Sequence, residues 1–241
     1  MKYILLFLIT IFAYSKTYIA TYTSKYGWFG TVATAKGIYE HNDTHYTITT
    51  KVKTKGVAAA LSGNLVQEYK SIGIIKDGKL IPQKYIVDIK RKGNDYYRVY
   101  IFDHKNKTVL KKRYKNGKLT KQYKYYYAPD DILTLYWNLP KYLKEEKKEL
   151  YTFHAVGGSK KNGRVDITFP KDEELKELKD EFETKGTYIK ANLYNKVFVG
   201  DKGVLYLVIN PDNWVTLAGM VKNVMKIGDL KGKITYFKEL P

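Results

Sequence analysis

Two adjacent carboxylates, Asp130 and Asp131, are the residues of this sequence whose type and spacing come closest to acid/base chemistry. They stand in APDDILTLYWNLP, residues 128–140, directly before an almost wholly apolar run. Glycoside cleavage needs two carboxylates that face a substrate from opposite sides, roughly 5 to 9.5 Å apart. Neighbouring residues at a helix start point in divergent directions. A glycan-active enzyme that uses Asp130 or Asp131 is therefore the less favoured interpretation.

The same segment has the composition of a short buried helix. A carboxylate at a helix start accepts backbone N–H bonds and suits the positive end of the helix dipole, which favours Asp130 as a cap. The run that follows is apolar nearly all round, and such a helix must be buried. We expect a plug helix in the concave side of a sheet, ended by Pro140. The residues assigned to this structural plug are Asp130, Leu133, Tyr136 and Trp137.

A basic hairpin, residues 107–127, is the best candidate for binding. No Asp or Glu occurs between His104 and Pro129. Cations interleaved with tyrosines suit single-stranded nucleic acid, and equally a membrane surface, where lysines approach anionic headgroups. Lysines on edge strands also guard against aggregation, which is the structural alternative. The residues predicted to bind an anionic surface are Lys111, Lys112, Arg113, Lys115, Lys118, Lys121 and Lys124.

The N-terminal residues predict export. An apolar stretch from Ile4 to Phe12 follows Lys2 and precedes Ala13-Tyr14-Ser15, which is the pattern of a cleaved signal peptide. The stretch is shorter than the roughly 20 residues that span a bilayer. A buried first strand or an uncleaved anchor is the alternative. We predict a signal peptide at 1–15, a single domain at 16–241, and a periplasmic location, which favours lipid over nucleic acid as the partner of the hairpin.

Composition narrows the function classes further. The formal net charge is +19, which favours anionic partners through long-range attraction, although solvated strand faces in a lysine-rich chain would give the same excess. There is no cysteine, which removes disulfides, thiolate metal sites and cysteine nucleophiles. His41 and His45 fit a solvated turn better than a zinc site, and no serine stands in G-x-S-x-G. We expect no cofactor, no metal and no catalytic residue; the oligomeric state stays open.

The elements that would position these residues are mainly strands. Period-two alternation in residues 45–56 and 84–93 is typical of half-buried strands, and Asp77-Gly78 and Asn116-Gly117 are hairpin signals. About a dozen such segments predict one long antiparallel meander, which forms a strongly curved sheet or a partly open barrel. A charged helix with a narrow apolar stripe, predicted within residues 170–186, should lie on the surface.

Five segments in the same order resemble an exported bacterial family of unknown function, domain of unknown function 3108. They are YGWFGTVATAKG at 26–37, YTITTKVKTKGVAAALSG at 46–63, EYKSIGIIKDGKLIPQKY at 68–85, DDILTLYWNLP at 130–140 and IGDLKGKITYF at 227–237. The resemblance implies the architecture and an envelope location but no mechanism, because the family carries no agreed catalytic residues. More distantly, the chain is similar to half-barrel lipoprotein carriers of the periplasm, in which a curved sheet covers an apolar cavity plugged by helices.

Three functions stay open at the level of the sequence. The first is a non-enzymatic envelope protein that binds an apolar or anionic, lipid-like component or an envelope partner. The second is a structural or assembly factor without a small ligand, and the third is the glycan-active enzyme. An apolar cavity beneath the sheet would favour the first, a filled interior the second, and a polar cleft with facing carboxylates the third.

Overall fold

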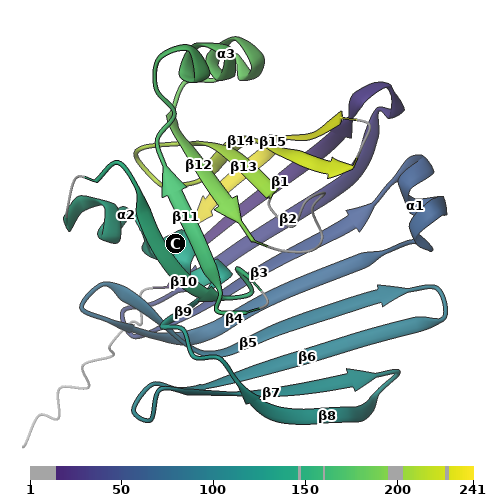
Figure 1. Ribbon diagram of the computed structural model, residues 1–241, viewed down its shortest axis with the longest axis vertical. Coiled ribbons are helices and arrows are strands. Elements are labelled where there is room, and N and C mark those ends of the chain that lie inside the picture. Colours follow the sequence, from purple (N-terminus) through teal and green to yellow (C-terminus); the bar gives the residue numbers. More distant parts are fainter. Residues whose placement is uncertain (1–14, 146–147, 160, 195–202, 226–227) are drawn as a thin grey trace, which may run out of the picture.

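The computed structural model describes residues 15–145, 148–159, 161–194, 203–225 and 228–241 (Figure 1). Within them, fifteen strands form one sheet in the order β8-β7-β6-β5-β4-β3-β2-β1-β15-β14-β13-β12-β11-β10-β9. Neighbouring strands pair antiparallel except β9 and β10, which are parallel. The predicted fold class, a curved and mainly antiparallel sheet that does not close, is confirmed. The predicted signal peptide lies outside the described residues except for Ser15.

The N-terminal half of the sheet is a meander. Its strands are β1 (Lys16–Tyr26), β2 (Thr31–His41), β3 (His45–Thr54), β4 (Val66–Lys76), β5 (Lys79–Arg91), β6 (Asn94–Asp103), β7 (Thr108–Lys115) and β8 (Lys118–Tyr125). A 3-10 turn, η1 (Gly27–Phe29), joins β1 to β2, and a short helix, α1 (Gly56–Ser62), joins β3 to β4. Asp77-Gly78 and Asn116-Gly117 form tight turns with positive φ at both residues, as two-residue hairpins require.

The C-terminal half contains the two longer helices. Its elements are β9 (Asp130–Asp131), α2 (Ile132–Glu145), β10 (Tyr151–Val156), β11 (Arg164–Thr168), α3 (Asp172–Phe182), β12 (Thr187–Leu193), β13 (Gly203–Ile209), β14 (Thr216–Met225) and β15 (Gly228–Leu240). After β8 the chain crosses from one edge of the sheet to the other, where β9 pairs with β10. Figure 1 shows α2 at one end of the sheet, from which β3 to β8 run to the turns at the other end.

The two faces of the sheet carry different helices. Leu135 and Leu139 of α2 pack against Ile189 on the concave face, whereas Leu178 and Phe182 of α3 pack against the neighbouring residue, Tyr188, on the convex face. Successive residues of a strand point to opposite faces, so the two helices lie on opposite sides of β12. The predicted plug helix and the predicted charged surface helix are both confirmed.

The helix α2 does not end at Pro140, as the sequence predicted, but continues to Glu145. A proline inside a helix has no N–H to donate to the carbonyl four residues earlier, here that of Tyr136. The indole N–H of Trp214 donates to that carbonyl instead, at 3.1 Å. The prediction was wrong because a distant side chain satisfies the carbonyl group that the proline leaves open.

Candidate functional site

Asp131 caps α2 from a fully buried position. Its Oδ1 accepts the backbone N–H groups of Leu133 at 2.9 Å and Thr134 at 3.1 Å, and Thr134 Oγ1 accepts the N–H of Asp131 at 2.8 Å. This reciprocal pair satisfies donors that a helix start leaves open. Asp131 Oδ2 accepts the hydroxyl of Ser71 at 2.5 Å, which ties the helix start to β4. The prediction of Asp130 as the cap was wrong: α2 begins at Ile132, so Asp131, the residue directly before it, supplies the capping carboxylate.

Burial governs the protonation of this carboxyl group. No part of Asp131 is exposed, and burial raises its pKa to about 7, although hydrogen bonds from Ser71 and from the backbone of Thr134 and Leu133 act against the rise. At Asp131 the loss of solvation destabilises the charged carboxylate more than these three hydrogen bonds stabilise it. Asp131 is therefore a neutral hydrogen-bonding group at mildly acidic pH.

Asp130, the residue before Asp131, accepts hydrogen bonds from two side chains further along α2. Its Oδ1 accepts the side-chain amide of Asn138 at 2.8 Å and its Oδ2 accepts the hydroxyl of Tyr142 at 2.7 Å. Asn138 also donates to the carbonyl of Leu80 and accepts its N–H, both at 2.9 Å, as a neighbouring strand would. Asp130 is 2% exposed and burial raises its pKa. Both carboxylates therefore form hydrogen bonds that hold the fold together, and neither faces a space that a substrate could enter.

An apolar pocket of about 230 Å³ lies between α2 and the concave face. Leu133, Tyr136 and Trp137, all assigned to the plug from the sequence, form its helical wall. The residues on the sheet are Tyr18, Ala20, Tyr22, Gly37, Ile38, Tyr39, Ile48, Thr49, Thr50, Thr216 and Phe237, and Val215 lies directly before β14. Sequence reasoning missed the sheet wall, although Tyr18, Ala20 and Tyr22 alternate along β1 in the pattern of a single face.

The aromatic side chains of this pocket support one another. The ring of Trp137 lies 4.3 Å from that of Tyr39 and 6.1 Å from that of Tyr18, measured between centroids. Tyr136 donates its hydroxyl to the carbonyl of Trp214 at 2.6 Å and lies 2.8 Å from Thr216 Oγ1. The phenol oxygen of Tyr136 is thereby satisfied, and the ring presents carbon to the pocket.

The seven cations predicted to bind an anionic surface do not form one face. Lys111, Arg113, Lys115, Lys118 and Lys121 lie on the concave side of β7 and β8, whereas Lys112 and Lys124 alternate to the convex side. Lys111 is only 9% exposed, and its ammonium lies 4.1 Å from the ring centroid of Tyr125. Cation–π contacts of this length are attractive. A flat anionic surface would meet only a part of the set.

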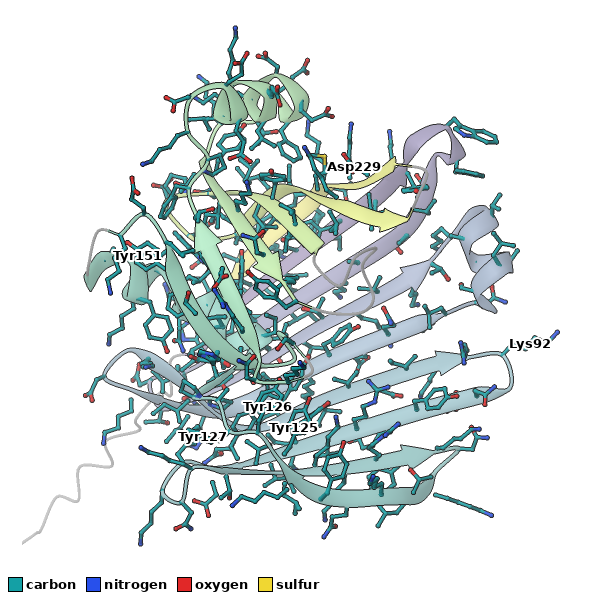
Figure 2. The ribbon with its side chains drawn as sticks, in the orientation of Figure 1. Lys92, Tyr125, Tyr126, Tyr127, Tyr151 and Asp229 are labelled. Carbon is teal, nitrogen blue, oxygen red and sulfur yellow. The ribbon has the colours of Figure 1, made fainter. Side chains whose placement is uncertain are left out.

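The tyrosines after β8 connect the hairpin to the far edge of the sheet. Figure 2 shows Tyr125, Tyr126 and Tyr127 where the chain leaves β8. Tyr126 donates its hydroxyl to the carbonyl of Ser159 at 2.7 Å, and the hydroxyl of Tyr127 lies 3.0 Å from His104 Nδ1. Tyr126 and Tyr127 therefore hold the crossing segment in place.

The other candidate residues from the sequence do not come together as a catalytic or metal-binding site in the described part of the chain. His45 Nδ1 lies 2.8 Å from its neighbour Thr44 Oγ1, and the ring of His41 stacks on that of Tyr39. Among the residues that the structure describes, no three His, Cys, Asp or Glu side chains are grouped as metal ligands. Nor does any helix in those residues have the length and apolar character needed to cross a bilayer.

Comparison with known proteins supports the fold. No family model matches the chain, and no curated protein matches it in sequence. Among solved structures it is similar to a β-barrel-like protein of domain of unknown function DUF1849 from Brucella abortus, at 9% identity and a TM-score of 0.53. That likeness covers 94% of this chain and 98% of the other. It shows a β-barrel-like fold; the resemblance to domain of unknown function 3108 stays a prediction.

Proposed function

We propose that this protein is a non-enzymatic envelope module that binds an apolar, lipid-like component after export to the periplasm. The observation that carries the proposal is the pocket of about 230 Å³ between α2 and the concave face. An apolar cavity of about 150 Å³ in another protein stays dry and takes up benzene, so a pocket of this size and lining suits a stretch of hydrocarbon. The signal-peptide pattern at 1–15 and the resemblance to an exported family support the proposed location.

The other two functions receive less support from the same geometry. A structural factor without a ligand needs no unfilled space, yet a pocket remains that residues of α2, β1, β2 and β3 line together. A glycan-active enzyme needs exposed carboxylates, whereas Asp130 and Asp131 are bonded inside the core. The pocket therefore favours the binding module over both.

Filling the pocket tests the proposal. A Cβ added at Gly37 meets nothing within 4 Å, and Gly37 lines the pocket, so Gly37→Leu places a side chain in the ligand's space without a backbone clash. We expect the wild type to bind dodecyl maltoside, used below the concentration at which it forms micelles, and Gly37→Leu to bind it at least about tenfold more weakly. Isothermal titration calorimetry measures both.

The matched control is Lys36→Leu, which adds the same side chain to the opposite face of β2. It should bind dodecyl maltoside as the wild type does. Native mass spectrometry and lipid extraction of protein purified from its own envelope would then identify the natural ligand. The proposal fails if the wild type binds no amphiphile, or if Gly37→Leu binds it unchanged.

A further inference from the structure

Three cations face one another across β6, β7 and β8 on the concave face. Arg98 pairs directly with Arg113, and Arg113 pairs directly with Lys121. Like charges in directly opposed cross-strand positions destabilise a sheet. None of these three side chains forms an ion pair within the described part of the chain. The arrangement is costly for folding and leaves three cations available to an anion.

The positions around this row are aromatic or basic. On one side, Tyr100 pairs with Lys111 and Lys111 with Tyr123; on the other, Tyr96 pairs with Lys115. The ammonium of Lys121 lies 5.2 Å from the centroid of the Tyr123 ring. Rings beside the cations limit the directions that these side chains take, so the cations remain over the concave face.

The carboxylates of the same strands all lie on the convex face. Asp88 pairs with Tyr97, Asp95 with Lys90 and Asp103 with Thr108, in the positions that alternate with the concave ones. Strands β7 and β8 contain no acidic residue. A lysine-rich chain with a merely solvated surface would distribute its acids over both faces. Here the concave face of β5 to β8 is basic, and the convex face is mixed.

The line of directly paired positions that contains the three cations continues across the sheet to the apolar pocket. From Arg98 it passes through Val87, Tyr69 and Thr50 to Gly37 and then to Ala20. Gly37, Thr50 and Ala20 line the pocket, and no residue between them and Arg98 in this row is charged. At about 4.8 Å per strand, the distance along the sheet from β3 to β6 is about 14 Å, which is within the reach of one acyl chain.

We infer that the concave face of β6 to β8 binds the anionic head group of an amphiphile whose hydrocarbon chain occupies the pocket. This inference rests on the proposed function and names the class of ligand, a phosphate-bearing amphiphile. Arginine favours this chemistry, because its planar fork donates two parallel hydrogen bonds to a phosphate. The head group would also supply the negative charge that the row of Arg98, Arg113 and Lys121 lacks.

Three probes and two variants test the inference. The probes are dodecyl phosphate, dodecyl maltoside with the same chain and a neutral head, and inorganic phosphate with no chain. We expect the wild type to bind dodecyl phosphate at least about tenfold more tightly than dodecyl maltoside, with a preference that weakens as salt is added. The double variant Arg98→Gln/Arg113→Gln should lose that preference and keep its affinity for dodecyl maltoside.

The control Lys112→Gln/Lys124→Gln removes the same charge from the convex face of the same hairpin, and should keep the preference. Folding gives an independent check, because removing opposed like charges should raise the melting temperature of Arg98→Gln/Arg113→Gln. Equal binding of both amphiphiles by the wild type overturns the inference and leaves the proposed function standing, whereas binding of neither overturns both. Inorganic phosphate bound as tightly as dodecyl phosphate, or a control that loses the preference equally, also overturns the inference.

Discussion

Replacing Asp131 by asparagine should remove a pH dependence of folding that the wild type carries between about pH 4 and pH 7. In the folded protein, burial raises the pKa of Asp131 from 3.8 to about 7. Between these values the folded carboxyl group keeps its proton while the unfolded one releases it. Folding therefore takes up a proton, and the free energy of unfolding falls as the pH rises.

The magnitude follows from the two pKa values. One pKa unit corresponds to about 1.4 kcal/mol, so a rise of about three units corresponds to about 4 kcal/mol of stability lost between pH 4 and pH 7. Asparagine reproduces the neutral form. Its carbonyl oxygen can accept the N–H groups of Leu133 and Thr134, and its amide can donate to Ser71. The variant should match the wild type near pH 4 and exceed it at neutral pH.

Urea unfolding of wild type, Asp131→Asn and Asp166→Asn at each pH unit from 2 to 8 measures this difference. Asp166→Asn is the control of opposite sign. Burial by itself would raise the pKa of Asp166, but hydrogen bonds from Arg164, Tyr194 and Thr152 outweigh it and lower that pKa. The stability that Asp166 contributes is present above its unfolded pKa and disappears as the pH falls through the folded one. A constant difference between wild type and Asp131→Asn from pH 4 to pH 7 would refute the reasoning.

Three further predictions concern the plug helix and the N-terminus. Trp137→Ala should lower the free energy of unfolding by about 2–4 kcal/mol, less than for a fully buried ring, and an unchanged thermal melt would contradict its role in the plug. Trp214→Phe should cost about 1–2 kcal/mol by leaving the Tyr136 carbonyl without a donor. Its cost should shrink in a Pro140→Ala background, where the helix supplies that donor. Intact mass of protein from the native host should show a chain that begins near Lys16.

Local patterns in the sequence were sufficient for most of the fold. Alternation places side chains on two faces, Asp77-Gly78 and Asn116-Gly117 set hairpins through their positive φ values, and the stripe of α3 is visible in its own residues. Each of these signals depends on neighbours within a few residues. The length of α2 does not, because the donor that replaces the missing N–H of Pro140 is Trp214, on the loop between β13 and β14.

The candidate site was harder to predict from the sequence, because the register of the strands determines which side chains come together in it. The basic hairpin was recognised as a run of cations, but its own residues do not say which of them share the face of α2. Arg98 stands outside that run and becomes the neighbour of Arg113 only when β6 pairs with β7. Ser71, which donates to Asp131, likewise stands 60 residues earlier in the chain and reaches that carboxyl group only in the folded sheet.

The pairing of the first strand with the last has a consequence for how the protein folds. Thr17 of β1 lies opposite Leu240 of β15, and this ladder is the junction between the N-terminal meander and the C-terminal half of the sheet. Contacts between residues so distant in the chain form slowly, because a long loop must be closed first. During synthesis β1 to β8 can assemble in order, but β1 keeps an unpaired edge until β15 is complete. A chain that stops before Gly228 would expose that edge to other chains, so protection of β1 against aggregation depends on β15.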